Sequence, residues 1–304
     1  MAAESQLGPM TLFGPVTVFG GTGFLGRAIV ERLLAEGITV RVAARHPDKA
    51  ATGGQPVYAD LRDEASVAHA IEGSEAVVNA VGLYVETGAE TFEAVHVLGA
   101  RNLAQQAAAR GVGRLVHVSG IGADPHSESS YVRARAAGER LVTQAFPQAT
   151  ILRPSVLFGP QDSFLNALAG IASRTPVLPL FGRGDTRLQP VYVRDVAEAA
   201  LRALTHPEAA GKTYELGGPE VYSYRALVEL VLERSERRRF LLPLPFPVWR
   251  TLAALASLLP APPLTRAQVV LMQRDNVVAE GALSLGDLGI DATALEDVLA
   301  DYAF

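Results

Sequence analysis

The chain has 304 residues, 27 Lys plus Arg against 32 Asp plus Glu, a formal net charge of -5 and a hydrophobic content of 49%. This composition supports a sizeable core and excludes wholesale disorder, and a mildly acidic chain without a basic block is not expected to bind nucleic acid. The absence of cysteine excludes disulfides, thiolate chemistry and cysteine-type metal sites, and the six histidines show no close ligand spacing, so we expect no metal.

The first ten residues contain Glu4 and no Lys or Arg, so the basic region of an export signal is missing. No run of about 18 uncharged apolar residues occurs in the chain, and we therefore expect no membrane span. These features predict a cytoplasmic protein, with peripheral attachment to the inner face of the membrane as an alternative.

Short apolar runs alternate with helical patterns along the first half of the chain. The runs typical of buried strands are 16–19, 38–43, 57–59, 76–79, 115–119 and 150–152, and the helical patterns are 23–36, 65–71, 91–110 and 131–145. Gly37 and Gly111 follow two of these helices, where a left-handed cap favours glycine. Strands that are apolar throughout and separated by helices predict a doubly wound α/β fold with a parallel sheet covered on both faces.

The first strand–helix junction contains a glycine-rich loop with Gly20, Gly23 and Gly26. In such a loop the first glycine allows the tight turn, the second lets backbone approach a pyrophosphate, and the third lets the helix pack closely on the strand. The helix N-terminus then presents free N–H groups to the phosphates. The motif predicts a Rossmann-type dinucleotide site, and the alternative is a glycine turn with a structural role only.

The end of the second strand distinguishes the two nicotinamide cofactors. An NAD site usually has an acidic residue there to accept a hydrogen bond from the ribose 2′-hydroxyl, but Ala44 occupies the position and Arg45 follows it. Arg45, with Lys49 and His46 nearby, offers cations for a 2′-phosphate. We therefore expect NADP(H) rather than NAD(H), and the alternative is a solvated basic loop.

The pattern becomes irregular after Pro160. A strand at 190–193, a helix at 194–204 and a strand at 213–216 are expected to return to the main sheet. Residues 14–160, rejoined by about 189–216, would then form the dinucleotide-binding domain. Residues 161–188 and 217–285 would form a smaller, irregular C-terminal lobe over the carboxyl edge of the sheet, and 286–304 a C-terminal helix.

The segment from Phe240 to Leu264 is apolar apart from Arg250 and is interrupted by six prolines. Its apolar residues recur at steps of three and four and predict one helical stripe, formed by Trp249, Leu252, Leu255, Leu258 and Leu259. The stripe is either ordinary core of the small lobe or an exposed docking surface.

Several motifs together resemble those of an atypical or extended short-chain dehydrogenase/reductase of the NAD-dependent epimerase/dehydratase type. They are the loop at 20–26, Asp60–Asp63, Asn79–Gly82, Val116–Ser119, Tyr131 and Arg153–Ser155. Other segments resemble, more narrowly, the bacterial relatives of the NADPH-binding accessory subunit of respiratory complex I. These are Thr91–His96, His117–Ala123, Ile151–Gly159, Gln189–Val193 and Thr213–Pro219.

The resemblance implies a set of cofactor contacts. In the glycine loop they are Gly20, Thr22, Gly23, Phe24, Leu25 and Gly26. Asp60 and Leu61 would lie beside the adenine, although Asp60 is equally explained as a turn-forming residue. Ala80, Val81 and Gly82 would pass under the cofactor ribose, and Pro154 and Ser155 would contact the nicotinamide end.

The same resemblance implies a catalytic trio. Short-chain reductases use a Ser, a Tyr as general acid, and a Lys four residues after the Tyr, on the same helical face. Here Ser119 and Tyr131 are present, but position 135 is Arg. Arg135 supplies the positive charge that could bind ribose and favour tyrosinate, but it cannot give up a proton. The alternative is that Ser119 and Tyr131 are structural residues only.

Two functions follow. The first is an NADP(H)-binding accessory or assembly subunit of the complex I type with weak or no catalysis, which would use Phe240–Leu264 to dock on a respiratory-complex or other membrane-protein partner. The second is an NADP-dependent reductase, dehydrogenase or sugar-nucleotide epimerase that acts through Ser119 and Tyr131. The sequence contains no motif that identifies a substrate.

Overall fold

The structure is a computed structural model that describes residues 12, 14–49, 53–257, 259 and 264–304. The expectations for residues 1–10, for Leu258 and for the prolines at 260, 262 and 263 lie outside these residues. Within the described ranges, the helices are all too short or too polar to cross a membrane.

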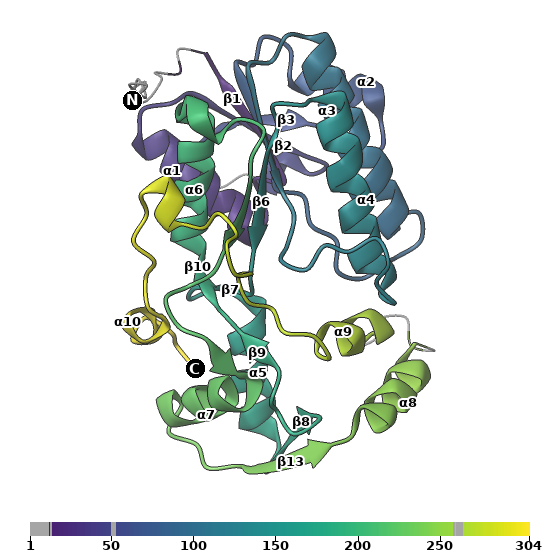
Figure 1. Cartoon of the computed structure of the whole chain (residues 1–304), viewed down its shortest axis with the longest axis vertical. Coiled ribbons are helices and arrows are strands. Elements are labelled where there is room, and N and C mark those ends of the chain that lie inside the picture. Colours follow the sequence, from purple (N-terminus) through teal and green to yellow (C-terminus); the bar gives the residue numbers. More distant parts are fainter. Residues whose placement is uncertain (1–11, 13, 50–52, 258, 260–263) are drawn as a thin grey trace.

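A seven-stranded, fully parallel sheet forms the centre of the molecule, which confirms the predicted doubly wound α/β fold (Figure 1). The strands run in the order β11-β6-β5-β4-β1-β2-β3. Their bounds are β1 Val16–Phe19, β2 Val40–Ala44, β3 Gln55–Tyr58, β4 Ala76–Asn79, β5 Arg114–Val118, β6 Thr150–Pro154 and β11 Thr213–Leu216. Because the central strands β1 and β4 are buried along their whole length, both faces of the sheet have to be covered there by helices.

Two helical layers cover the sheet. Helices α1 (Phe24–Ala35) and α6 (Val193–Thr205) lie on one face, where Val16 and Val18 of β1 join their core. Helices α2 (Glu64–Ala70), α3 (Ala100–Ala109) and α4 (Ser130–Ala145) lie on the other, where Phe19 and Val77 are buried. Alternate residues of one strand therefore belong to different cores.

The helix expected at 91–110 begins as a π-helical turn, η2 (Glu93–Gly99), and continues as α3. Helix α4 crosses this turn at Gly138, where an added Cβ would lie 2.0 Å from the His96 carbonyl oxygen. Only a residue without a side chain allows the two backbones to approach so closely.

The small lobe lies below the carboxyl edge of the sheet (Figure 1). Its core lies between α5 (Ser163–Arg174) and α7 (Tyr224–Arg234). It contains two-stranded sheets of β8 (Val177–Phe181) with β13 (Phe240–Leu244) and of β9 (Arg187–Leu188) with β12 (Tyr222–Ser223). The lobe also contains helices α8 (Phe246–Ala256) and α9 (Arg266–Leu271). The 3-10 turns η1 (Pro47–Lys49) and η3 (Pro207–Ala209) lie outside the lobe, next to β3 and α6 respectively.

The strand expected at 190–193 does not join the main sheet. It is β10 (Val191–Tyr192), which pairs with β7 (Leu157–Phe158), a short strand beyond the end of β6. Helix α6 begins at the next residue, Val193, so the chain turns away before it reaches the sheet. Of the two expected strands, only β11 rejoins the sheet, next to β6.

The C-terminal residues do not form the single helix expected at 286–304. They form a 3-10 turn, η4 (Gly286–Leu288), which ends at Gly289 with φ +70°, and a five-residue helix, α10 (Leu295–Leu299). Leu283 bridges Tyr214 of β11, and the turn packs on the core shared by α1 and α6. The chain therefore returns to the main sheet before 285, whereas α10 packs on the small lobe.

Candidate functional site

The glycine loop forms a tight cradle between β1 and α1. Gly20 has φ +77°, and a Cβ on it would lie 2.8 Å from the Ala80 carbonyl oxygen; one on Gly26 would lie 2.0 Å from the Gly20 carbonyl oxygen. Gly23 is exposed, and a Cβ on it would have only the Gly20 carbonyl oxygen as a neighbour, at 3.3 Å. Gly23 also caps α1 without a side-chain acceptor, so the first N–H groups of the helix remain available to an anion. This cradle fits a pyrophosphate.

Arg45 follows β2 at the carboxyl edge of the sheet, and its guanidinium forms an ion pair with Glu90, on the segment after β4. Nearby, Arg62 binds the Asp60 carboxylate through Nε and Nη2, and these hydrogen bonds lower the pKa of Asp60. Lys49 is exposed at the end of η1. The structure therefore brings Arg45 and Asp60 to one region, with Glu90 as an acidic neighbour that the sequence did not indicate.

Ser119, Tyr131 and Arg135 are all buried. Ser119 directly follows β5, and its hydroxyl has no hydrogen-bond partner among the described residues. Tyr131 and Arg135 lie one turn apart on α4, where Arg135 Nε donates to Tyr131 Oη at 2.8 Å and its Nη1 donates to the Val118 carbonyl oxygen at 3.3 Å. The orphaned Ser119 hydroxyl leaves one buried donor free for a ligand.

Tyr131 is enclosed by aromatic rings and is only 8% exposed. Tyr84 stacks on it at 5.6 Å between ring centroids, and Phe92 and His96 meet it edge-on at 5.4 and 5.5 Å. Helix α9 of the small lobe packs on the same cluster. Tyr131 is therefore covered by the side chains of Tyr84, Phe92 and His96.

Burial determines the protonation of Tyr131. Desolvation raises the pKa of Tyr131 far above its ordinary value, and the opposing effect of the Arg135 charge is smaller. Arg135 therefore acts in the expected direction, toward tyrosinate, but burial outweighs its effect and the pKa of the hydroxyl is raised overall.

Two buried histidines lie near Arg135 that sequence reasoning did not assign to the site. Asn79 Oδ1 accepts from the Val81 N–H at 3.2 Å, so its Nδ2 is left to donate to His117 Nδ1 at 3.1 Å. Burial, with the Arg135 charge as the second cause, lowers the pKa of His117 to about 3 and that of His96 to about 4. The signal for His117 was a polar residue inside an otherwise apolar strand.

The residues expected at the ribose and nicotinamide ends follow β4 and β6. Ala80, Val81 and Gly82 leave β4 next to the glycine loop, and Leu61 is buried beside Gly99 of η2. Pro154 ends β6 and accepts from the Ile121 N–H at 3.2 Å. The Ser155 hydroxyl lies 2.6 Å from Asn276 Oδ1, so it already has a protein partner. That partner, 121 residues further along, could not be found from local sequence.

The apolar segment is divided between core and surface. Trp249 is buried, its Nε1 donates to the Leu180 carbonyl oxygen at 3.0 Å, and its ring lies 4.3 Å from that of Phe181. The expectation of a single stripe is therefore wrong for Trp249. The exposed side chains form what we call the α8 face: Val248, Leu252, Leu255 and Leu259, at 42%, 43%, 61% and 55% exposure.

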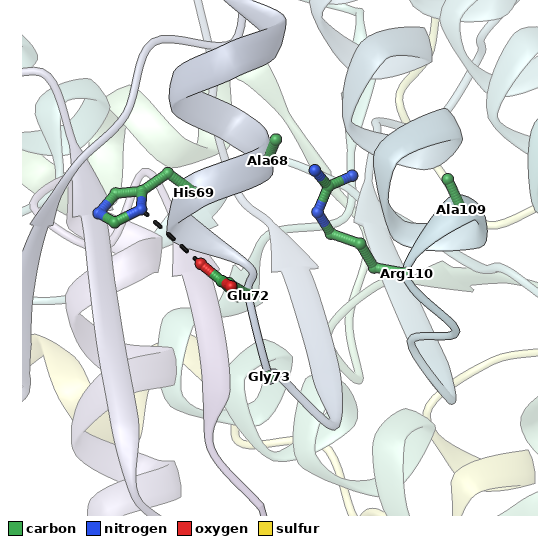
Figure 2. A pocket seen from close by; sticks show the side chains of 6 residues that line it. All are labelled: Ala68, His69, Glu72, Gly73, Ala109 and Arg110. Atoms are coloured by element: carbon green, nitrogen blue, oxygen red, sulfur yellow. Dashed lines mark ion pairs between the residues drawn. The ribbon is translucent and has the colours of Figure 1, made fainter.

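A shallow hollow at the other end of the molecule is unrelated to these motifs. Figure 2 shows it between the C-terminal ends of α2 and α3, with Glu72 4.0 Å from His69 and with Arg110 opposite. Both side chains of the first pair are mostly exposed. Ligands of doubly wound folds bind at the carboxyl edge of the sheet, and this hollow lies at the amino edge.

The parallel sheet, the glycine cradle and the serine–tyrosine pair define a protein of the extended short-chain dehydrogenase/reductase class. The chain belongs to the NAD dependent epimerase/dehydratase family, whose family model matches residues 16–217.

The chain is similar to proteins with different names. The chain is 36% identical over 294 residues to the mitochondrial NADH dehydrogenase [ubiquinone] 1 alpha subcomplex subunit 9 of Arabidopsis thaliana, covering 90% of this chain and 73% of that protein. It is 35% identical over 188 residues to the ceramide reductase of Caulobacter vibrioides, covering 60% and 59%. The structure of MoeE5 in complex with UDP-glucuronic acid and NAD superposes with a TM-score of 0.72 at 20% identity over 95% and 97% of the two chains.

Proposed function

We propose that this protein binds a nicotinamide dinucleotide, preferably NADP(H), and serves as an accessory or assembly subunit of a complex I-type respiratory enzyme, with weak or no catalysis. The observation that carries the proposal is a difference in exposure: Gly23 in the glycine cradle is exposed to solvent, whereas Tyr131 is enclosed. The cradle would hold the cofactor, while Tyr131, the residue that would act on a substrate, is covered.

The cofactor would be held by the cradle of Gly20, Gly23 and Gly26, with Arg45 and Lys49 at the 2′-phosphate. Ala44 adds no carboxylate to the end of β2. A bound nicotinamide supplies hydride transfer. A tightly bound cofactor also stabilises the folded state, by about 4 kcal/mol when its concentration is 1,000 times Kd.

The residues at the nicotinamide end favour positioning over turnover. Arg135 holds the Tyr131 hydroxyl through Nε and keeps its own proton at any working pH. The proton relay that lysine provides in short-chain reductases is therefore missing, and the rings of Tyr84, Phe92 and His96 occupy the space around the phenol.

The α8 face supports a partner. It presents the apolar side chains of Val248, Leu252 and Leu255 to solvent on a helix that begins after Pro245, and that of Leu259 just beyond the end of the helix. The name of the Arabidopsis relative places that protein in a respiratory NADH dehydrogenase. We propose that the α8 face docks on a membrane-protein subunit of such an enzyme, at the inner face of the membrane, rather than on lipid alone.

The experiment is to purify the protein without added nucleotide and to identify the bound ligand by mass spectrometry. We expect NADP(H) in near-stoichiometric amount, and no oxidation of the bound NADPH by quinones or carbonyls. Protein that is free of nucleotide and binds none on addition would refute the cofactor proposal. Rapid oxidation would refute the non-catalytic role.

A second candidate function is an NADP-dependent reductase or epimerase. The unpartnered Ser119 hydroxyl favours it, because a buried donor without a partner suits a substrate carbonyl. The ceramide reductase relative, at 35% identity, is consistent with it. Under this function, NADPH oxidation by a carbonyl substrate would depend on both Ser119 and Tyr131.

A further inference from the structure

The segment between β4 and η2 holds Glu90 in a defined place. Thr87 and Glu90 exchange two backbone hydrogen bonds of 3.0 Å around Gly88, which has φ +57°. The Glu86 carboxylate then accepts from the Phe92 N–H at 2.7 Å. This tight hairpin fixes the backbone of Glu90, so its side chain is directed to Arg45, 45 residues earlier in the chain.

Glu90 and a 2′-phosphate would require the same cation. A phosphate monoester carries about -1.5 to -2 charges at neutral pH, so a carboxylate on the same guanidinium both competes with it and repels it. The other nearby carboxylate, Asp60, is held by Arg62 through three contacts of 2.5 to 3.1 Å. Glu90 is thus the carboxylate that decides whether Arg45 is available.

We propose that Glu90 is a specificity-determining residue of the cofactor site, which competes with the 2′-phosphate for Arg45 and so limits the preference for NADP(H) over NAD(H). The inference rests on the proposed function, which assigns Arg45 to that phosphate. In this arrangement the repulsion between Glu90 and the 2′-phosphate, as well as the attraction of Arg45, sets the ratio of the affinities for NADPH and NADH. Because Arg45 and Glu90 are 45% and 31% exposed, the effect is moderate and decreases with salt.

The test is Glu90→Gln, with binding of NADPH and NADH measured by isothermal titration calorimetry on the full chain freed of nucleotide. We expect NADPH to bind up to about fivefold more tightly, the upper end of the range for one exposed ion pair, and NADH to bind as before. The matched control is Glu93→Gln, which removes the same charge from an exposed side chain three residues further along and should change neither affinity.

The same titrations on Arg45→Ala and on the double variant separate the two proposals. Arg45→Ala should weaken NADPH by about tenfold or more and spare NADH, and on that background Glu90→Gln should lose its effect. If Glu90→Gln changes neither cofactor, or weakens NADH by removing an acceptor for ribose hydroxyls, the role of Glu90 is refuted while that of Arg45 stands. If Arg45→Ala weakens both cofactors equally, the assignment of Arg45 to the 2′-phosphate is refuted, and the role of Glu90 with it; a wild type that binds NADH as tightly as NADPH would refute the preference for NADP(H) itself.

Discussion

Arg135 is a buried guanidinium whose hydrogen bonds, within the described chain, go to the Tyr131 hydroxyl and the Val118 carbonyl. The nearest carboxylate on its own helix, Glu139, is bound by Arg153 at 2.6 Å. The phenol oxygen is therefore a main acceptor for a charge that is costly to bury. Tyr131 has a structural role here, whatever its part in chemistry.

Because of this arrangement, Tyr131→Phe tests both the structural role and the catalytic role of Tyr131. Loss of the acceptor leaves Arg135 Nε unpaired, so we expect the free energy of unfolding to fall by about 1–3 kcal/mol, measured by urea denaturation. Bound nucleotide, measured by absorbance after denaturation, should be unchanged. Any turnover of the wild type with carbonyl substrates should vanish in Tyr131→Phe, and it should be equal or higher in Arg135→Lys. Turnover that survives in Tyr131→Phe would exclude Ser119, Tyr131 and Arg135 as the catalytic group.

His117 predicts a pH dependence of stability. Its pKa is lowered to about 3 in the fold, from 6.5 in the unfolded chain. Between pH 6.5 and pH 3 the unfolded state binds a proton at this residue that the native state does not. The free energy of unfolding is therefore fully retained above pH 6.5, and it falls by about 1.4 kcal/mol for each pH unit below that value.

The measurement compares wild type with His117→Gln in urea at pH 7 and pH 5. His117→Gln is expected to be less stable at pH 7, because the contact with Asn79 is disturbed, but to lose less stability on acidification. Equal losses in the two proteins would contradict a neutral, buried His117.

At the scale of elements, the contact between α4 and η2 depends on one glycine. A methyl group at Gly138 would collide with the backbone of His96, which cannot move without shifting the turn that carries Phe92 and His96 against Tyr131. We expect Gly138→Ala to lower the free energy of unfolding by about 1–3 kcal/mol.

The control is Gly170→Ala on α5. A Cβ at that position meets nothing within 4 Å, and alanine is the better helix former, so we expect this variant to be unchanged or slightly more stable in the same urea denaturation. If the two variants behave alike, the close crossing of α4 and η2 is not a determinant of stability.

At the scale of the whole molecule, the small lobe has two roles. Helix α9 packs on the cluster around Tyr131, and α8 turns Trp249 inward and its apolar face outward. The small lobe thus covers Tyr131 with α9 and presents the α8 face to solvent. If the α8 face docks on a partner, docking and the covering of Tyr131 involve adjacent helices.

Replacing Leu252 and Leu255 by Glu tests this surface. Both side chains are exposed, so the melting temperature should change by no more than a few degrees, whereas association with the membrane fraction of the native host should be lost. The control is Val221→Glu, an exposed apolar residue outside the α8 face, which should retain association. Loss of folding would assign the leucines to the core, and retained association would refute docking.

Local sequence was sufficient for the sheet and the cradle. The spacing of the apolar residues follows from which face a strand or helix buries. Gly20 and Gly26 are required by close backbone contacts near one strand–turn–helix unit. The α/β class, the strands from β1 to β6 and the glycine cradle could therefore be predicted without knowledge of distant contacts. Resemblance to a family added Ser119 and Tyr131.

Contacts between distant segments decided the rest. Periodicity places Trp249 and Leu252 close together on α8, but only packing against Leu180 and Phe181 shows that Trp249 is the buried one. Likewise, the pKa of Tyr131 depends on rings brought in from the segment after β4, and the availability of Arg45 depends on Glu90. A sequence pattern shows which side chains share a face, but burial and charge depend on what lies against that face, and only the tertiary structure supplies it.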